Sequence, residues 1–374
     1  MLLVMELKRH DRKIQKHLDA IASSDPAESA EAMGLQYMTD EGDGIRRIKQ
    51  GDEFNYMGLD GEVITDSDEI KRIQSLGIPP AWENVWICPA PNGHLQATGR
   101  DAKGRKQYRY HVRWRSFRDQ TKFTRMIAFS EAIPRIRERI AHDLALSGLP
   151  RNKVLATVVQ LMELTRIRVG NEEYAKTNKS FGLTTMRDRH VKVDGSTIRF
   201  KFRGKSGVEH EIELNDRRLA RIVKRCQDIP GQELFQYIDA DGQRQSIDSS
   251  DINTYLRDIT GQDFTAKDFR TWAGTVLAAR ELHEIGACES ATAAKKAIVQ
   301  AVKTVAQHLG NRPATCRKYY VHPAILDAFE LGSLFDVMAT HLQQSIEESP
   351  HQLRCEEQAV VLLLKQQLIQ EIAA

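Results

Sequence analysis

Hydrophobic and polar positions divide the chain into two regions with different periodicity. From about residue 33 to 112 the apolar residues form short alternating runs, separated by turn residues such as Gly51, Gly61 and Pro79-Pro80. Alternation between turns is typical of short antiparallel strands. This region is therefore predicted to be a small α+β domain with an antiparallel sheet.

From Ser130 onward, apolar residues recur at the spacing of helices. One helix is predicted from Ser130 to near Gly148 and another over 154–167. Further helices are predicted around 216–227, 250–259, 266–284, 291–308, 313–331 and 333–372, with Pro323 and Pro350 limiting individual stretches. The apolar stripe of the last stretch is predicted to pack against the rest of this mainly helical region.

Residues 189–214 depart from the helical pattern. Asp194-Gly195 separates two alternating segments, and the four residues from Gly204 to Gly207 separate the second segment from a third. Two turns of this kind predict a three-stranded β-meander. Lys205 would then lie at the tip of a hairpin.

These patterns predict an α+β chain with a small N-terminal antiparallel-sheet domain and a mainly α-helical second domain that contains the three-stranded meander. The predicted limits are 1–30 for an N-terminal extension with a basic helix over 1–22, 31–120 for the first domain, 121–348 for the second, and 349–374 for a C-terminal helical tail.

Composition excludes several classes of protein. With 374 residues and 41% hydrophobic residues, the chain is long and apolar enough to bury a core, which argues against a disordered or fibrous protein. The five cysteines lie far apart, as expected of reduced thiols in the cytoplasm. No run approaches the length of a membrane span, so no membrane contact is expected.

Motifs for cofactors are missing from the sequence. No His-Glu-x-x-His pattern or Cys/His cluster has the spacing of metal ligands. Gly204-Lys205-Ser206 resembles the end of a phosphate-binding loop, but Arg199 stands where that motif needs its first glycine. We therefore expect no metal, no nucleotide and no other cofactor.

The formal net charge of +3 hides a polarised chain. The net charge is −7 for residues 1–99, +8 for 100–125, +8 for 126–325 and −6 for 326–374. The stretch 100–125 interleaves its cations with Tyr108, Tyr110, Trp114 and Phe117. Cations suit phosphates and aromatic rings suit bases and sugars, so a nucleic-acid surface is predicted there, the alternative being a solvated basic face with strand aromatics.

Candidate chemistry comes from four separated stretches rather than from one motif. They are Ile167-Arg-Val-Gly-Asn171, Phe202-Arg-Gly-Lys205, Lys267-Asp-Phe-Arg-Thr-Trp272, and Leu309-Gly-Asn-Arg-Pro313 continuing to Tyr319-Tyr320. Two arginines, a lysine, an amide and a tyrosine are sufficient to cleave a phosphodiester. The tyrosine attacks phosphorus, and guanidinium groups neutralise the charge that gathers on the non-bridging oxygens.

In order and spacing, these stretches resemble the type IB DNA topoisomerases of the compact bacterial and poxviral kind, over about residues 35–330. The resemblance implies that Arg168 and Arg270 hold the scissile phosphate and that Tyr320, nine residues after Asn311, attacks it to form a 3′-phosphotyrosyl bond. The neighbouring Tyr319 is the competing nucleophile. The family usually has a small residue such as Ser or Ala at that position, so this chain departs from the family pattern there.

The same resemblance implies the remaining catalytic roles. Lys205 would be the general acid that protonates the leaving 5′ oxygen, and Lys267 would assist that proton transfer. Asn311 stands where many relatives have His, and its amide N–H can still donate to a non-bridging oxygen. This substitution is expected to mute acid-limb pH dependence from that position without abolishing activity.

Residues that contact DNA are implied by the stretch that begins at Gly99, in which relatives place a Gln and two tyrosines in the major groove. Tyr174 matches a family tyrosine near the scissile phosphate, although a helix-surface aromatic is an equally good interpretation. The implied DNA-binding set is Arg105, Gln107, Tyr108, Tyr110, Arg118 and Tyr174.

The family fold implies a monomer that clamps duplex DNA between its two domains and relaxes supercoils of either sign without ATP or an obligatory metal. We expect such an enzyme in the cytoplasm, associated with the nucleoid. Two alternatives stay open from the residues: a tyrosine site-specific recombinase, which uses a similar catalytic set, and a non-catalytic DNA clamp.

Overall fold

The computed structural model describes residues 26–373, apart from 52, 103, 105 and 343–348. The described residues form two compact units that meet between Phe123 and Thr124, inside one long helix. The predicted basic helix over 1–22 lies outside the described residues. The domain limits drawn from the sequence stay a prediction.

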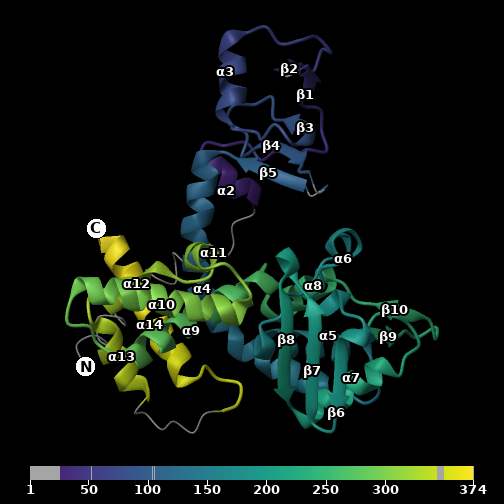
Figure 1. Cartoon of the computed structure of the whole chain (residues 1–374), viewed down its shortest axis with the longest axis vertical. Coiled ribbons are helices and arrows are strands. Elements are labelled where there is room, and N and C mark those ends of the chain that lie inside the picture. Colours follow the sequence, from purple (N-terminus) through teal and green to yellow (C-terminus); the bar gives the residue numbers. More distant parts are fainter. Residues whose placement is uncertain (1–25, 52, 103, 105, 343–348, 374) are drawn as a thin grey trace. The chain divides into compact units, whose positions relative to one another are not determined.

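A five-stranded antiparallel sheet forms the first unit, in the order β2-β1-β3-β4-β5 (Figure 1). The elements of this unit are α2 (Pro26–Ala32), β1 (Ile45–Gln50), β2 (Glu53–Met57), α3 (Ser67–Ser75), β3 (Glu83–Ile87), β4 (Leu95–Arg100) and β5 (Lys106–Tyr110). The α+β prediction for this part of the chain is confirmed.

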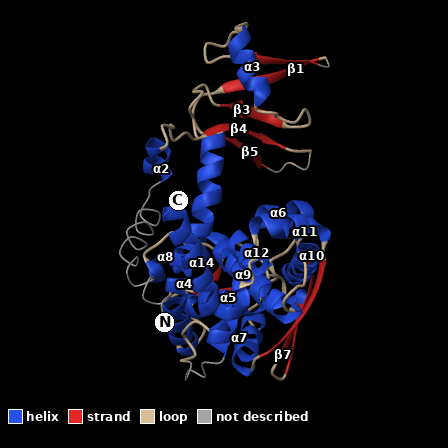
Figure 2. Ribbon diagram, turned by 90° about the vertical axis from the view of Figure 1, so that its left-hand side faces the viewer, coloured by secondary structure: helices blue, strands red, loops and turns tan. Residues whose placement is uncertain are grey.

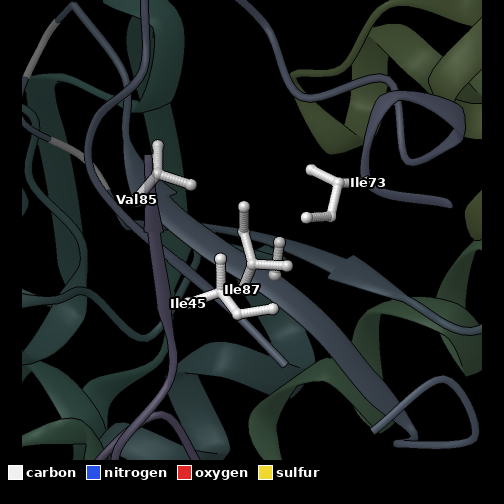
Figure 3. Close-up of a cluster of buried hydrophobic side chains, with 5 residues drawn as sticks. Ile45, Ile73, Val85 and Ile87 are labelled. Carbon is white, nitrogen blue, oxygen red and sulfur yellow. The ribbon is translucent and has the colours of Figure 1, made fainter. Parts of the chain in front are cut away.

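The core of this unit lies between the sheet and α3. Ile73 of α3 packs against Ile45, Val85 and Ile87 of the sheet (Figure 3), and all four side chains are buried. Asp66 starts α3, because its carboxylate accepts hydrogen bonds from the second and third helical N–H groups. Burial of these aliphatic side chains is the main force that holds α3 on the sheet.

A second cluster of buried side chains includes helix α2. In it, Ala30 of α2 is buried with Leu35 and Trp114. Trp114 had been grouped with the nucleic-acid surface, and that prediction is wrong because its ring is 4% exposed. A cation-rich neighbourhood in sequence does not show which ring faces inward.

Helices dominate the second unit, which also holds two small sheets (Figure 2). The helices are α4 (Val112–Ala145), which begins in the first unit, α5 (Arg151–Thr165), α6 (Glu172–Asn178), α7 (Arg217–Gln227), α8 (Ser249–Thr260), α9 (Ala266–Ile285), α10 (Ala291–Leu309), α11 (Pro313–Tyr319), α12 (Pro323–Glu330), α13 (Ser333–Leu342) and α14 (Cys355–Ala373). The strands are β6 (Val191–Asp194), β7 (Thr197–Arg203), β8 (Glu209–Asn215), β9 (Gln236–Ile238) and β10 (Arg244–Ser246).

The predicted meander is confirmed as the sheet β6-β7-β8. Its strands lie side by side in Figure 1, with α7 packed on β6 and β7 and α5 on β8. Gly195 turns between β6 and β7 in the left-handed region that glycine favours. The tip between β7 and β8 is a short 3-10 turn, Lys205–Gly207.

One helix prediction had the wrong start, and another divides where a proline was expected to limit it. Helix α4 begins at Val112 rather than Ser130, because arginine and lysine are good helix formers even without an apolar stripe, and His111 accepts the Arg113 N–H at its start. The stretch predicted over 313–331 divides between Tyr319 and Pro323, which confirms that Pro323 limits a helix there. Pro323 begins a new helix there, because it lacks the N–H that a continuous helix needs.

Helix α9 lies at the centre of the second unit, in contact with α5, α8, α10, α12, α13 and α14. The predicted packing stripe of α14 is confirmed, since Val360, Leu363 and Leu364 are buried. Within the described part of the chain, no helix has the length and apolar character needed to cross a membrane.

Candidate active site

Four of the predicted catalytic residues lie at the ends of helices. Arg168 follows α5, whose last turn is closed by Arg166 in the left-handed conformation. Arg270 lies near the start of α9, Asn311 follows α10, and Tyr320 caps α11. Side chains at helix ends and in the adjoining loops are less often buried than those in the middle of a helix. A reactive group in such a position can contact a substrate.

Arg168 and Asn311 meet although 143 residues separate them. The Arg168 guanidinium donates to the Gly310 carbonyl at 3.3 Å and to the Asn311 side-chain oxygen. Because a guanidinium only donates, this contact fixes which end of the amide faces Arg168. The Asn311 amide nitrogen is buried and has no hydrogen-bond partner among the described residues, so its N–H groups are available to an acceptor.

Arg270 is held by backbone carbonyls. Its guanidinium donates to the Arg166 carbonyl and, over 2.6 Å, to the Leu309 carbonyl, and the residue is 6% exposed. Burial, and next the nearby Arg168, lower the pKa of Arg270 to about 10. Among the described residues, no carboxylate is one of the groups that shift the pKa of either arginine. This pair of cations, a buried Arg270 and a half-buried Arg168, is therefore suited to an anionic group of a substrate.

Tyr320, rather than Tyr319, lies beside these cations. The Arg270 guanidinium carbon is 5.5 Å from the centre of the Tyr320 ring, and Tyr320 also interacts electrostatically with Arg168. Tyr319 is 43% exposed, and its ring lies 5.3 Å from the ammonium of Lys318. The geometry therefore favours Tyr320 as the nucleophile of any reaction at this site.

Two residues that the sequence analysis missed hold the backbone of Tyr320. The Thr275 hydroxyl donates to the Tyr320 carbonyl at 3.4 Å and accepts the His322 N–H at 3.1 Å. A side chain on Gly274 would place its Cβ only 2.3 Å from the same carbonyl, so glycine is required for this close approach. The pattern Thr-Trp-Ala-Gly-Thr carries no local signal for such a long-range contact.

Lys205 and Tyr174, two further residues that the sequence predicted for the site, lie close to each other. The Lys205 ammonium lies 5.9 Å from the centre of the Tyr174 ring, and Ser206 next to it has a left-handed backbone. Gly204, the neighbour of Lys205, lines the same small pocket as Arg168 and Arg270. The tip of the β7–β8 hairpin therefore lies beside the pocket that Arg168 and Arg270 line.

Lys267 is less closely associated with the site. It lies in the first turn of α9, is exposed, and is not among the residues that line the pocket. Its backbone N–H is capped by the Thr265 hydroxyl, with Asp268 completing the capping box. The structure therefore places Lys267 one helical turn from Arg270 without bringing its side chain into the pocket.

The predicted DNA-binding residues of the first unit lie on the edge strand β5. Tyr108 and Tyr110 are exposed on one face, with ring centres 6.0 Å apart and nearly parallel planes. Because side chains alternate along a strand, Gln107 lies on the other face, where its amide donates to Asp101 at 3.1 Å. Arg105 and the side chain of Arg118 lie outside the described residues.

An aromatic extension of this surface was missed by the sequence analysis. Tyr37, which is 47% exposed, stacks on His94 with 4.4 Å between ring centres, and His94 is next to Tyr110 at 6.1 Å. Tyr37 lies 71 positions before Tyr108, so only the sheet brings these rings into one row.

Two family models and several known proteins are similar to this chain. A family model described as the catalytic core of eukaryotic DNA topoisomerase I matches residues 111–333, and one described as the N-terminal domain of bacterial DNA topoisomerase IB matches residues 53–101. DNA topoisomerase 1B of Acanthamoeba polyphaga mimivirus is 34% identical over 301 residues, which cover 77% of this chain and 88% of the relative. DNA topoisomerase 1B of Vaccinia virus (strain Copenhagen) is 25% identical over 302 residues, covering 78% and 91%.

Proposed function

We propose that this chain, which belongs to the type IB DNA topoisomerases, relaxes supercoiled duplex DNA by cutting one strand with Tyr320 and resealing it. One observation supports this choice of residues above the others. The Arg270 guanidinium lies against the Tyr320 ring, Arg168 interacts electrostatically with the same tyrosine, and no carboxylate in the described part of the chain pairs with either arginine. The family match also argues against the alternative of a site-specific recombinase.

Cleavage begins with attack of the Tyr320 hydroxyl oxygen on the scissile phosphorus. The new bond joins tyrosine to the 3′ phosphate, and the bond from phosphorus to the 5′ oxygen breaks. Tyr320 gives its phenolic proton to water while the Lys205 ammonium gives a proton to the departing 5′ oxygen, and Lys205 then regains a proton from water, so protons and charge are balanced. A lysine on an exposed hairpin tip has the reach for this role.

Charge on the pentacoordinate phosphorus is stabilised by donors that are already in place. Arg168 and Arg270 donate to the non-bridging oxygens, and the buried Asn311 amide adds a further N–H. Because backbone carbonyls hold Arg270, little reorganisation is needed when the phosphate arrives. Tyr174, next to Lys205, contacts the DNA backbone close to the cut.

Resealing is the reverse transfer, in which the free 5′ hydroxyl attacks the phosphotyrosyl bond. This bond keeps the energy of the phosphodiester it replaces, so neither ATP nor an obligatory metal is required. Rotation of the cut strand between the two steps removes supercoils of either sign. In this proposal a monomer closes around duplex DNA, with Tyr108 and Tyr110 in the major groove, and works on nucleoid DNA in the cytoplasm.

A plasmid assay tests the proposal. Supercoiled plasmid incubated with the protein in excess EDTA, without nucleotide, is expected to give a ladder of relaxed topoisomers, for both positive and negative supercoils. Plasmid that stays supercoiled under these conditions would contradict the proposal. DNA binding with no covalent adduct would instead support a non-catalytic clamp, and joining of two specific sites without relaxation would support a recombinase.

A further inference from the structure

His210 of β8 lies in the catalytic pocket, although none of the proposed steps uses it. In β8 the side chains alternate between exposed and half-buried, and His210 falls on the half-buried face. It is directly opposite Phe202 of β7 in the sheet register. The two rings stack with centres 5.0 Å apart and planes at 14°, which fixes the orientation of the imidazole.

The imidazole of His210 fits between two glycines from distant parts of the chain. A Cβ on Gly204 would lie 2.6 Å from the ring atoms Cδ2 and Nε2, and one on Gly310 would lie 2.3 Å from Cε1. Neither glycine therefore tolerates a side chain while the ring is present. The ring fills the space between the β7–β8 turn and the loop that follows α10.

Each glycine is joined to a proposed catalytic residue. Gly204 immediately precedes Lys205, and Gly310 immediately precedes Asn311. The Gly310 carbonyl also accepts a hydrogen bond from Arg168. A shift of the His210 ring would therefore move the general acid on one side and the phosphate-binding donors on the other.

The charges around His210 favour a neutral ring. Burial, and next the guanidinium groups of Arg168 and Arg270, lower its pKa, while Glu209 on the same strand opposes this shift. His308 of α10 lines the same pocket. A neutral planar ring can fill this space without adding a third cation to the phosphate site.

Resting on the function proposed above, we infer that His210 is a positioning residue of the cleavage reaction. Its ring sets the spacing between the turn that carries Lys205 and the loop that carries Asn311. The residue acts through packing, so its shape matters more than its ring nitrogens.

The first experiment measures covalent capture of plasmid DNA, trapped with detergent in a single turnover. His210→Ala is expected to slow adduct formation by about 100-fold, the scale of a misplaced catalytic group, with DNA binding unchanged. His210→Phe keeps a planar ring on Phe202 and should retain most of the rate. His283→Ala is the matched control, because His283 is also half-buried beside a phenylalanine, Phe335, but outside the pocket.

The outcomes separate this inference from the proposed function. Absence of any adduct from the wild-type protein would contradict the proposed function itself. A wild-type protein that forms adducts, with His210→Ala as fast as wild type, would overturn only the inference. His210→Phe as slow as His210→Ala would also overturn it, since the nitrogens rather than the shape would then matter.

A double-mutant cycle keeps the inference testable if His210→Ala is poorly folded. Gly204→Ala should slow cleavage because its Cβ pushes against the ring, and the double variant Gly204→Ala/His210→Ala should be no slower than His210→Ala alone. Additive effects would show that the ring and the turn do not meet, and would overturn the inference. Melting temperatures of all four proteins monitor folding.

A sulfur leaving group tests the link to Lys205. Replacing the bridging 5′ oxygen by sulfur at a mapped cleavage site removes the need for a general acid, because a thiolate leaves without a proton. The His210→Ala defect should then shrink several-fold, as should that of Lys205→Ala. If the sulfur substrate corrects the defect of Lys205→Ala but leaves that of His210→Ala unchanged, His210 does not position Lys205, and this part of the inference is overturned.

Discussion

Arg270 is a buried cation that is held in place without a carboxylate partner among the described residues. A buried arginine usually meets a carboxylate, yet here the Arg166 and Leu309 carbonyls accept its N–H groups. Carbonyl oxygens fix the direction of the guanidinium while they leave most of its charge available. The Nε of Arg270 is buried with no partner among the described residues and is therefore a ready donor for a phosphate oxygen.

The identity of the nucleophile is the first prediction at the scale of residues. Tyr320→Phe removes the attacking oxygen but keeps the ring beside Arg270, so covalent capture of DNA should fall below detection while DNA binding is preserved. Tyr319→Phe is the matched control, because this exposed neighbour should be dispensable. Gel analysis of trapped adducts measures both. Loss of adducts in Tyr319→Phe alone would identify Tyr319 as the nucleophile.

At the scale of elements, a buried ion pair fixes α14 to the helices that carry the site. The Glu357 carboxylate accepts two hydrogen bonds from Arg137 of α4, at 2.8 and 3.0 Å, and one from the Trp272 indole of α9 at 3.2 Å. Trp272 is two residues after Arg270. The C-terminal helix is thus part of the framework that holds α9 in place.

Glu357→Gln is expected to destabilise the second unit by about 1.5–3 kcal/mol, because the buried Arg137 loses the charge of Glu357 and keeps only that of Glu163, which lies 2.8 Å away. Urea unfolding measures the change. Glu172→Gln, in the exposed pair with Lys176, is the control and should cost under about 1 kcal/mol. An effect of Glu357→Gln no larger than the control would show that the buried pair does not stabilise this packing.

At the scale of the whole molecule, histidines make stability depend on pH. Burial lowers the pKa of His111, His190 and His210 below the ordinary value of 6.5, with nearby arginines adding to the shift. The unfolded chain therefore takes up protons at these positions at a higher pH than the folded protein does. Their contribution to stability is full above pH 6.5 and is lost as the pH falls through their folded-state values.

The free energy of unfolding should accordingly decrease between about pH 7 and pH 5, before the carboxylates that have lowered pKa values begin to titrate. Urea unfolding at several pH values measures this, and His210→Phe should have a shallower dependence than the wild-type protein. Equal slopes for the two proteins would show that His210 does not contribute, and a flat profile for both would contradict the whole account.

Local chemistry in the sequence determined a large part of this protein. Gly195 and the Gly204–Gly207 turn predicted the meander, helical spacing predicted most helices of the second unit, and the order of the motifs indicated the family. These features were readable because a turn or a helix depends on residues close together in the chain.

Only the tertiary structure decided which side chains meet. It joined Arg168 to Asn311, placed His210 between two glycines, buried Trp114, and separated the face of Gln107 from that of Tyr108. Each of these contacts depends on how elements that are far apart in the sequence pack against one another. Periodicity shows that a face is apolar or charged, but the packing of distant elements determines what that face contacts.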